Sequence, residues 1–102
     1  MSFDGNEGGF IPTEEGTGYT SNHRDAHPES LNGFFFGRKM LEKLLAQDGA
    51  MGIRVYYGQD NEGNQKMVLA AAGEDEGDII GLVGDKGLPC PPRCKGSVLN
   101  SK

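Results

Sequence analysis

The stretch from residue 38 to residue 72 constrains the fold most, because the period of its apolar residues changes along it. Over 38–47, a methionine and three leucines recur at helical spacing and form one apolar stripe. Residues 52–58 and 66–72 instead alternate apolar side chains between two faces, as half-buried strands do. The segment 59–65 between them is rich in Asp, Asn and Gly. The pattern therefore predicts a helix followed by a β-hairpin.

Weaker patterns lie on either side of this region. Thr13 followed by two glutamates is typical of a helix start and predicts a helix over about 14–25, which its glycines weaken. Three consecutive phenylalanines at 34–36 suit a short buried strand. Residues 79–83 predict a short edge strand.

The simplest packing of these elements is an α+β fold. We expect a small antiparallel sheet of about three strands, formed by 34–36, 52–58 and 66–72, with helix 38–47 across one of its faces. The expected fold also includes the weaker N-terminal helix, an irregular N-terminal arm and an irregular C-terminal tail.

Along the chain we expect three parts. Residues 1–10 are rich in glycine and predict a flexible arm. Residues 11–85 form a single α+β domain. Residues 86–102 contain prolines and both cysteines and predict an irregular tail.

The composition limits the size of the core. The chain has 102 residues, of which 35% are hydrophobic and 17 are glycines. Glycine loses more backbone entropy on folding than any other residue. We therefore expect a core of about 15 to 20 side chains, supplemented by self-association or a covalent cross-link.

The charge and the apolar runs narrow the class of partner. A net charge of −5, from 15 acidic and 10 basic residues, disfavours nucleic-acid binding, which needs a basic surface. No apolar run reaches the ~20 residues that span a bilayer, and the N-terminus lacks the features of a signal peptide. We expect no nucleic-acid and no membrane partner and, by default, a cytoplasmic protein.

Three motifs occur together in this chain: Phe35-Phe36-Gly37, the run 52–58 (GIRVYYG) and the run 89–94 (PCPPRC). In combination they resemble a family of small, uncharacterised proteins found mainly in Bacteroidota. The resemblance covers residues 11–100 and implies no activity, ligand or catalytic residue.

Cys90 and Cys94 flank Pro-Pro-Arg, and this spacing leaves three alternatives open. The two cysteines form a local disulfide, supply half of a zinc site, or stay free in a rigid tail. His23 and His27 lie four residues apart and would complete a Cys₂His₂ site, which makes zinc the one cofactor that the sequence suggests. Pro28 argues against this site because it draws His27 away from helical geometry. The histidines are otherwise exposed polar residues at a helix end.

No catalytic motif is present, neither G-x-S-x-G nor G-x-x-x-x-G-K-[ST]. We predict a non-catalytic interaction or structural protein that self-associates as a subunit of a larger assembly. The motivation is that arms and open sheet edges pair with neighbouring copies by strand addition. The alternative is a metal-binding or redox-responsive module that uses the two cysteines. The candidate contact residues are Phe3, Phe10, Arg54 and Tyr56.

Overall fold

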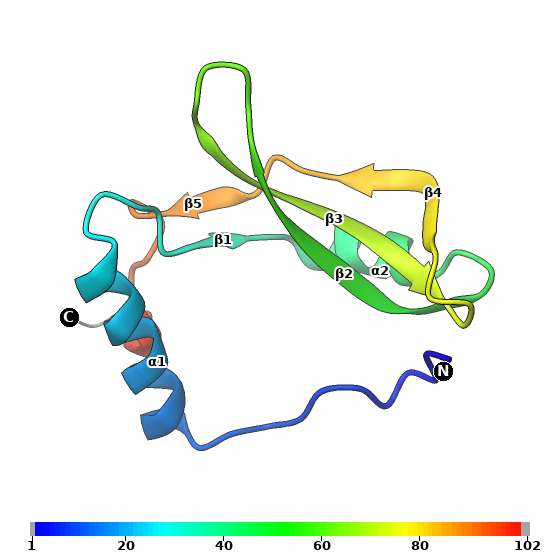
Figure 1. Ribbon diagram of the computed structural model, residues 1–102, viewed down its shortest axis with the longest axis horizontal. Helices are drawn as coiled ribbons and strands as arrows, with labels where there is room; N and C mark the ends of the chain where they lie inside the picture. The colour runs from blue at the N-terminus through cyan, green and yellow to red at the C-terminus, as the bar shows by residue number, and fades with distance from the viewer. Residues whose placement is uncertain (1, 101–102) are drawn as a thin grey trace. The chain divides into compact units, whose positions relative to one another are not determined.

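The structure is a computed structural model that describes residues 2–100. It is an α+β fold, as the sequence predicts, with two α-helices, five strands and a final 3₁₀ helix (Figure 1). The elements are α1 Thr13–Ala26, β1 Gly33–Phe35, α2 Arg38–Leu45, β2 Ala50–Gln59, β3 Gln65–Gly73, β4 Asp78–Gly84, β5 Leu88–Cys90 and η1 Val98–Asn100. Within the described residues, no helix combines the length and the apolar character needed to cross a bilayer.

The strands form two antiparallel sheets. β2, β3 and β4 make a three-stranded sheet in that order, whereas β1 pairs with β5 in a separate two-stranded sheet. The prediction that 34–36 belongs to the same sheet as 52–58 and 66–72 is therefore wrong. Part of the tail is also a strand, because a two-stranded ribbon has only edge positions and tolerates Pro89.

Contacts divide the chain into two compact units. We call residues 2–8 and 36–87 the hairpin unit, and residues 9–35 and 88–100 the disulfide unit. The arm, domain and tail expected from the sequence stay a prediction. The two units are defined by contacts, and pairing of β1 with β5 joins two segments far apart in the chain.

In the hairpin unit, α2 packs against one face of the β2–β3 hairpin (Figure 1). Leu44 of α2 is only 2% exposed. On the sheet, Leu69 of β3 pairs with Val55 of β2 on one side and with Gly84 of β4 on the other. A Cβ atom at Gly84 would overlap the Cε atom of Met40 in α2. Glycine at this position therefore lets the helix approach the sheet closely.

The buried core is smaller than the sequence suggests. Among the described residues, the buried apolar side chains are Leu44, Leu69, Ala70, Ala71 and Ala72, all in the hairpin unit. The expectation of about 15 to 20 core side chains was therefore too high. Three of the five buried residues are alanines on one strand. Alanine removes little apolar area from water. In the described part of the disulfide unit, no apolar side chain is buried.

We expect Leu44→Ala to destabilise the hairpin unit by about 2–4 kcal/mol, because it leaves a cavity that few neighbours can fill. Chemical denaturation followed by circular dichroism measures this loss. Leu45→Ala is the matched control, since the neighbouring leucine is 48% exposed. We expect the control to change the free energy of unfolding by less than about 1 kcal/mol. Equal losses in both variants would contradict the assignment of Leu44 as the centre of the core.

Candidate functional site

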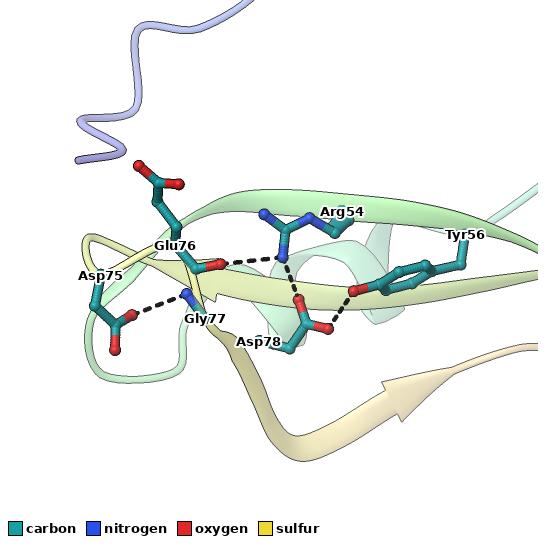
Figure 2. A network of polar contacts seen from close by, with 6 residues as sticks. All are labelled: Arg54, Tyr56, Asp75, Glu76, Gly77 and Asp78. Atoms are coloured by element: carbon teal, nitrogen blue, oxygen red, sulfur yellow. Dashed lines mark hydrogen bonds and ion pairs between the residues drawn. The ribbon is translucent and has the colours of Figure 1, made fainter. Parts of the chain in front are cut away.

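Three polar side chains meet on the face of the three-stranded sheet opposite α2 (Figure 2). Arg54 and Tyr56 lie two residues apart on β2 and so share one face. The Nη1 group of Arg54 donates to Oδ1 of Asp78 at 2.7 Å and to the carbonyl oxygen of Glu76 at 3.2 Å. The hydroxyl of Tyr56 donates to Oδ2 of Asp78. Asp78 begins β4, so this polar cluster connects the two outer strands across β3.

The polar cluster keeps the Asp78 carboxylate charged. The hydrogen bond from Tyr56, followed by the hydrogen bond and charge of Arg54, holds the pKa of Asp78 below the ordinary value of an aspartate. The side chains of Arg54 and Asp78 are 32% and 27% exposed, so water screens their attraction. The cluster therefore contributes more to strand orientation than to the net free energy of folding.

The turn between β3 and β4 supports this arrangement. Oδ1 of Asp75 accepts a hydrogen bond from the backbone N–H of Gly77 at 3.0 Å (Figure 2). Glu76 has a φ of 71°, a conformation that non-glycine residues rarely adopt. This turn presents the carbonyl oxygen of Glu76 to Arg54.

The N-terminal segment of the hairpin unit lies against the same end of the sheet. The backbone N–H of Phe3 donates to the carbonyl oxygen of Glu74 at 3.1 Å. The guanidinium carbon of Arg54 lies 5.3 Å from the centre of the Phe3 ring, within the range of a cation–π contact. A cavity of about 390 Å³ lies between this segment and the start of β2, and Glu7 and Met51 are among its lining residues. The lining of the cavity includes one carboxylate, one guanidinium and several apolar groups.

In the disulfide unit, Cys90 and Cys94 form a disulfide, one of the three alternatives left open by the sequence. Their Cα atoms lie 5.1 Å apart, within the usual range for such a bond. The backbone N–H of Asn32 donates to the carbonyl oxygen of Cys90 at 2.7 Å, next to the paired strands. Because the sulfurs are bonded to each other, neither is a thiolate ligand for zinc.

The rings of His23 and His27 lie side by side at the end of α1, with centroids 4.9 Å apart. Both residues are exposed. Among residues 2–100, no group of three or more His, Cys, Asp and Glu side chains is arranged to hold a metal ion. The structure therefore brings the two histidines together but does not assemble the Cys₂His₂ set.

Polar contacts also fasten η1 to α1, and sequence reasoning missed them. Oγ1 of Thr20 and Nη1 of Arg24 both donate to the carbonyl oxygen of Leu99, at 2.7 and 2.9 Å. Nδ2 of Asn32 donates to Oδ1 of Asn100 at 2.8 Å. The only signal in the sequence is an excess of hydrogen-bonding side chains in a helix with few apolar residues.

The four contact residues suggested by the sequence lie in different surroundings. Phe3 is half-buried, and its ring lies against Arg54. Arg54 and Tyr56 both donate hydrogen bonds to Asp78. Phe10 is fully exposed. Only Phe10 of the four therefore presents its whole side chain to solvent in this structure.

No family model matches the chain, and no curated protein or solved structure matches it. The resemblance to the Bacteroidota family stays a prediction. The evidence for function therefore lies in the geometry within each unit. In that geometry the polar groups of the sheet satisfy one another, while large apolar side chains remain exposed.

We expect Tyr56→Phe to raise the pKa of Asp78 toward the ordinary aspartate value, because it removes the largest cause of the shift. The folded-state pKa of Asp78 is depressed, so its contribution to stability is present above the unfolded value of about 3.9. That contribution is lost as the pH falls through the folded-state pKa. The Tyr56→Phe variant should therefore lose less stability on acidification than the parent.

A carbon-13 NMR titration of the Asp78 carboxyl group measures this pKa directly. Tyr57→Phe is the matched control, because the neighbouring tyrosine points to the other face and is 88% exposed. The control should leave the pKa of Asp78 unchanged. An unchanged pKa in Tyr56→Phe would show that the hydroxyl of Tyr56 does not hold the carboxylate in solution.

Proposed function

We propose that this protein is a non-catalytic interaction protein that associates with other copies of itself along strand β2. The observation that carries the proposal is that β2 is a ten-residue edge strand with exposed apolar side chains. An edge strand presents unpaired N–H and C=O groups, which pair readily with a strand from another molecule.

The two edges of the three-stranded sheet differ in how far they are protected. The pairing of β4 with β3 is irregular, since Leu69 pairs with Gly84 whereas Ala71 pairs with Ile79. Such bulges disrupt an edge and discourage pairing with another chain. β2 keeps a regular register from Gly52 to Gln59 and contains no proline. The edge at β2 is therefore the better template for strand addition.

The balance of buried and exposed apolar groups favours association. Residues 2–100 contain five buried apolar residues, whereas fifteen large apolar residues are exposed. On β2 these include Val55, Tyr56 and Tyr57, which are 50%, 41% and 88% exposed. Burying them against a second strand would add apolar burial that the small core lacks. Cross-strand pairs of aromatic and β-branched residues stabilise such contacts further.

Charge does not oppose contact along β2. The strand carries one charged residue, Arg54, which is paired with Asp78. A dense acidic group lies at residues 74–78, and its member Asp78 is paired with Arg54. Two copies that meet along β2 therefore bring together strands whose one charged residue is already neutralised by an ion pair. Their remaining long-range repulsion is screened by salt, so association should strengthen as ionic strength rises.

We expect Tyr57→Lys to weaken self-association by at least about tenfold, because lysine is a residue that natural edge strands use to prevent pairing. Sedimentation velocity and native mass spectrometry over a range of concentrations measure the dissociation constant. Tyr19→Lys is the matched control, since it makes the same change at an exposed tyrosine of α1. The control should associate as the parent does. A strict monomer at high concentration, or equal weakening by both variants, would contradict the proposal.

A redox-responsive module is a second candidate function, favoured by the disulfide between Cys90 and Cys94. Cys90 pairs with Gly33 at the end of the two-stranded sheet, and its carbonyl oxygen accepts a hydrogen bond from Asn32. Breaking the disulfide would loosen the segment that completes this sheet. The disulfide unit has no buried apolar side chain among its described residues to compensate.

We expect the double variant Cys90→Ser, Cys94→Ser to lose about 2 kcal/mol of stability in the disulfide unit, the chain-entropy value for a short closed loop. Denaturation followed by the NMR signals of β1 and β5 measures this loss. Reductant should produce a similar loss in the parent and none in the double variant. If the parent is equally stable with and without reductant, the redox-responsive function has no basis.

A further inference from the structure

The end of α1 carries two imidazole rings in an unusual arrangement. His23 lies in the last turn of the helix, and His27 is its C-cap residue. Pro28 disfavours the helical conformation for His27, whose φ of −134° and ψ of 66° lie outside the helical region. The backbone N–H of His27 nevertheless donates to the carbonyl oxygen of His23 at 2.8 Å. The last turn therefore stays closed and keeps both rings on one side of the helix.

The spacing of the rings matches that of two imidazoles bound to one metal ion. With metal–nitrogen bonds of about 2.0–2.1 Å and an angle of about 90–110° at the metal, ring centroids lie about 4.5–5.2 Å apart. The centroids of His23 and His27 are 4.9 Å apart. Both residues are exposed, so hydrated ions can reach the rings and small rotations can align the nitrogens. We propose that His23 and His27 form a binding site for a divalent transition-metal ion.

The chemistry of the two ligands defines the class of ion. Imidazole nitrogens suit Cu²⁺, Ni²⁺ and Zn²⁺, and the affinity of such a site is highest for Cu²⁺. Calcium and magnesium prefer oxygen ligands and are excluded by this ligand type. Because no third His, Cys, Asp or Glu completes a metal-binding group in residues 2–100, water fills the remaining positions. The bound ion is therefore exchangeable, unlike the ion of a closed structural zinc site.

Metal binding at this site would stabilise α1. The helix has 14 residues, includes Gly16 and Gly18, and buries none of its side chains. A helix of this length and composition is marginal in water. An ion held by His23 and His27 joins the last turn to the C-cap, so it binds the helical form more tightly than the unfolded form. By mass action, the ion then shifts the equilibrium toward the helix.

The effect extends to the C-terminal segment through existing contacts. Thr20 and Arg24 of α1 donate hydrogen bonds to the carbonyl oxygen of Leu99 in η1. These donors keep their positions only while α1 is helical. Occupancy of the histidine site therefore strengthens the attachment of η1 to α1. This inference does not depend on strand addition along β2.

Titration of the untagged, full-length protein with Cu²⁺ and Zn²⁺ tests the site. The chain contains only two histidines, so nitrogen-15 shifts of imidazole report this site alone. We expect one ion per chain and an increase in helical circular dichroism at 222 nm, with shifts of both rings in Zn²⁺ and paramagnetic broadening of both rings in Cu²⁺. His23→Gln and His27→Gln should each weaken binding by about tenfold or more, because each removes one of two ligands.

A control variant separates this site from the acidic surface. Asp75→Asn changes an exposed carboxylate of the β3–β4 turn and should leave the imidazole shifts and the affinity unchanged. Absence of imidazole shifts at millimolar Zn²⁺, together with absence of imidazole broadening at millimolar Cu²⁺, would overturn the proposal. Equal affinity in the parent and in both histidine variants would overturn it as well, since the ion would then bind elsewhere.

Discussion

The pairing of β2 with β3 is the interaction on which the rest of the hairpin unit depends. Its register places Val55 opposite Leu69 on the face that α2 covers, and it places Arg54 opposite Ala70 on the other face. A slip of one residue would exchange these two faces. The turn that sets the register is held by Asp60, whose Oδ1 atom accepts backbone hydrogen bonds from Glu62 and Asn64 at 2.9 and 2.8 Å. The apolar surface on β2 and the polar cluster at Asp78 both follow from this one register.

The alanines of β3 explain why the hairpin unit is compact and yet buries little apolar area. Ala70, Ala71 and Ala72 are almost completely enclosed, which is possible because small side chains allow close approach from both faces of the sheet. The same small side chains contribute little apolar area, so most of the larger groups of β2 and β4 remain exposed. In such a sheet, the apolar area that can still be buried lies on these exposed side chains and not in the alanine core. The association proposed along β2 would cover part of this exposed apolar area.

Local patterns allowed much of the hairpin unit to be predicted. The helix expected over 38–47 is α2, and the strands expected over 52–58 and 66–72 are β2 and β3. The pairing of β1 with β5 could not be predicted, because it joins residues far apart in sequence and Pro89 argued against a strand. Arg54 was named as a candidate contact residue, but its partner Asp78 was not predicted, because the irregular register of β4 hides their proximity. The cysteines illustrate the same limit, since their spacing allowed three outcomes and only backbone geometry selects the disulfide.

The disulfide unit depends on bonds between specific groups, whereas the hairpin unit depends on packing. The described residues of the disulfide unit include no buried apolar side chain. The parts of this unit are joined by the β1–β5 pairing, the disulfide, and polar contacts of Thr20 and Arg24 with η1. Each hydrogen bond contributes on the order of 1 kcal/mol and the disulfide about 2 kcal/mol, so the loss of any one of them is not compensated by a large core. Adding or removing a single cross-link therefore shifts a large fraction of the stability of this unit. The proposed redox response of the disulfide and the proposed metal site at His23 and His27 would each act on this unit by adding or removing one such cross-link.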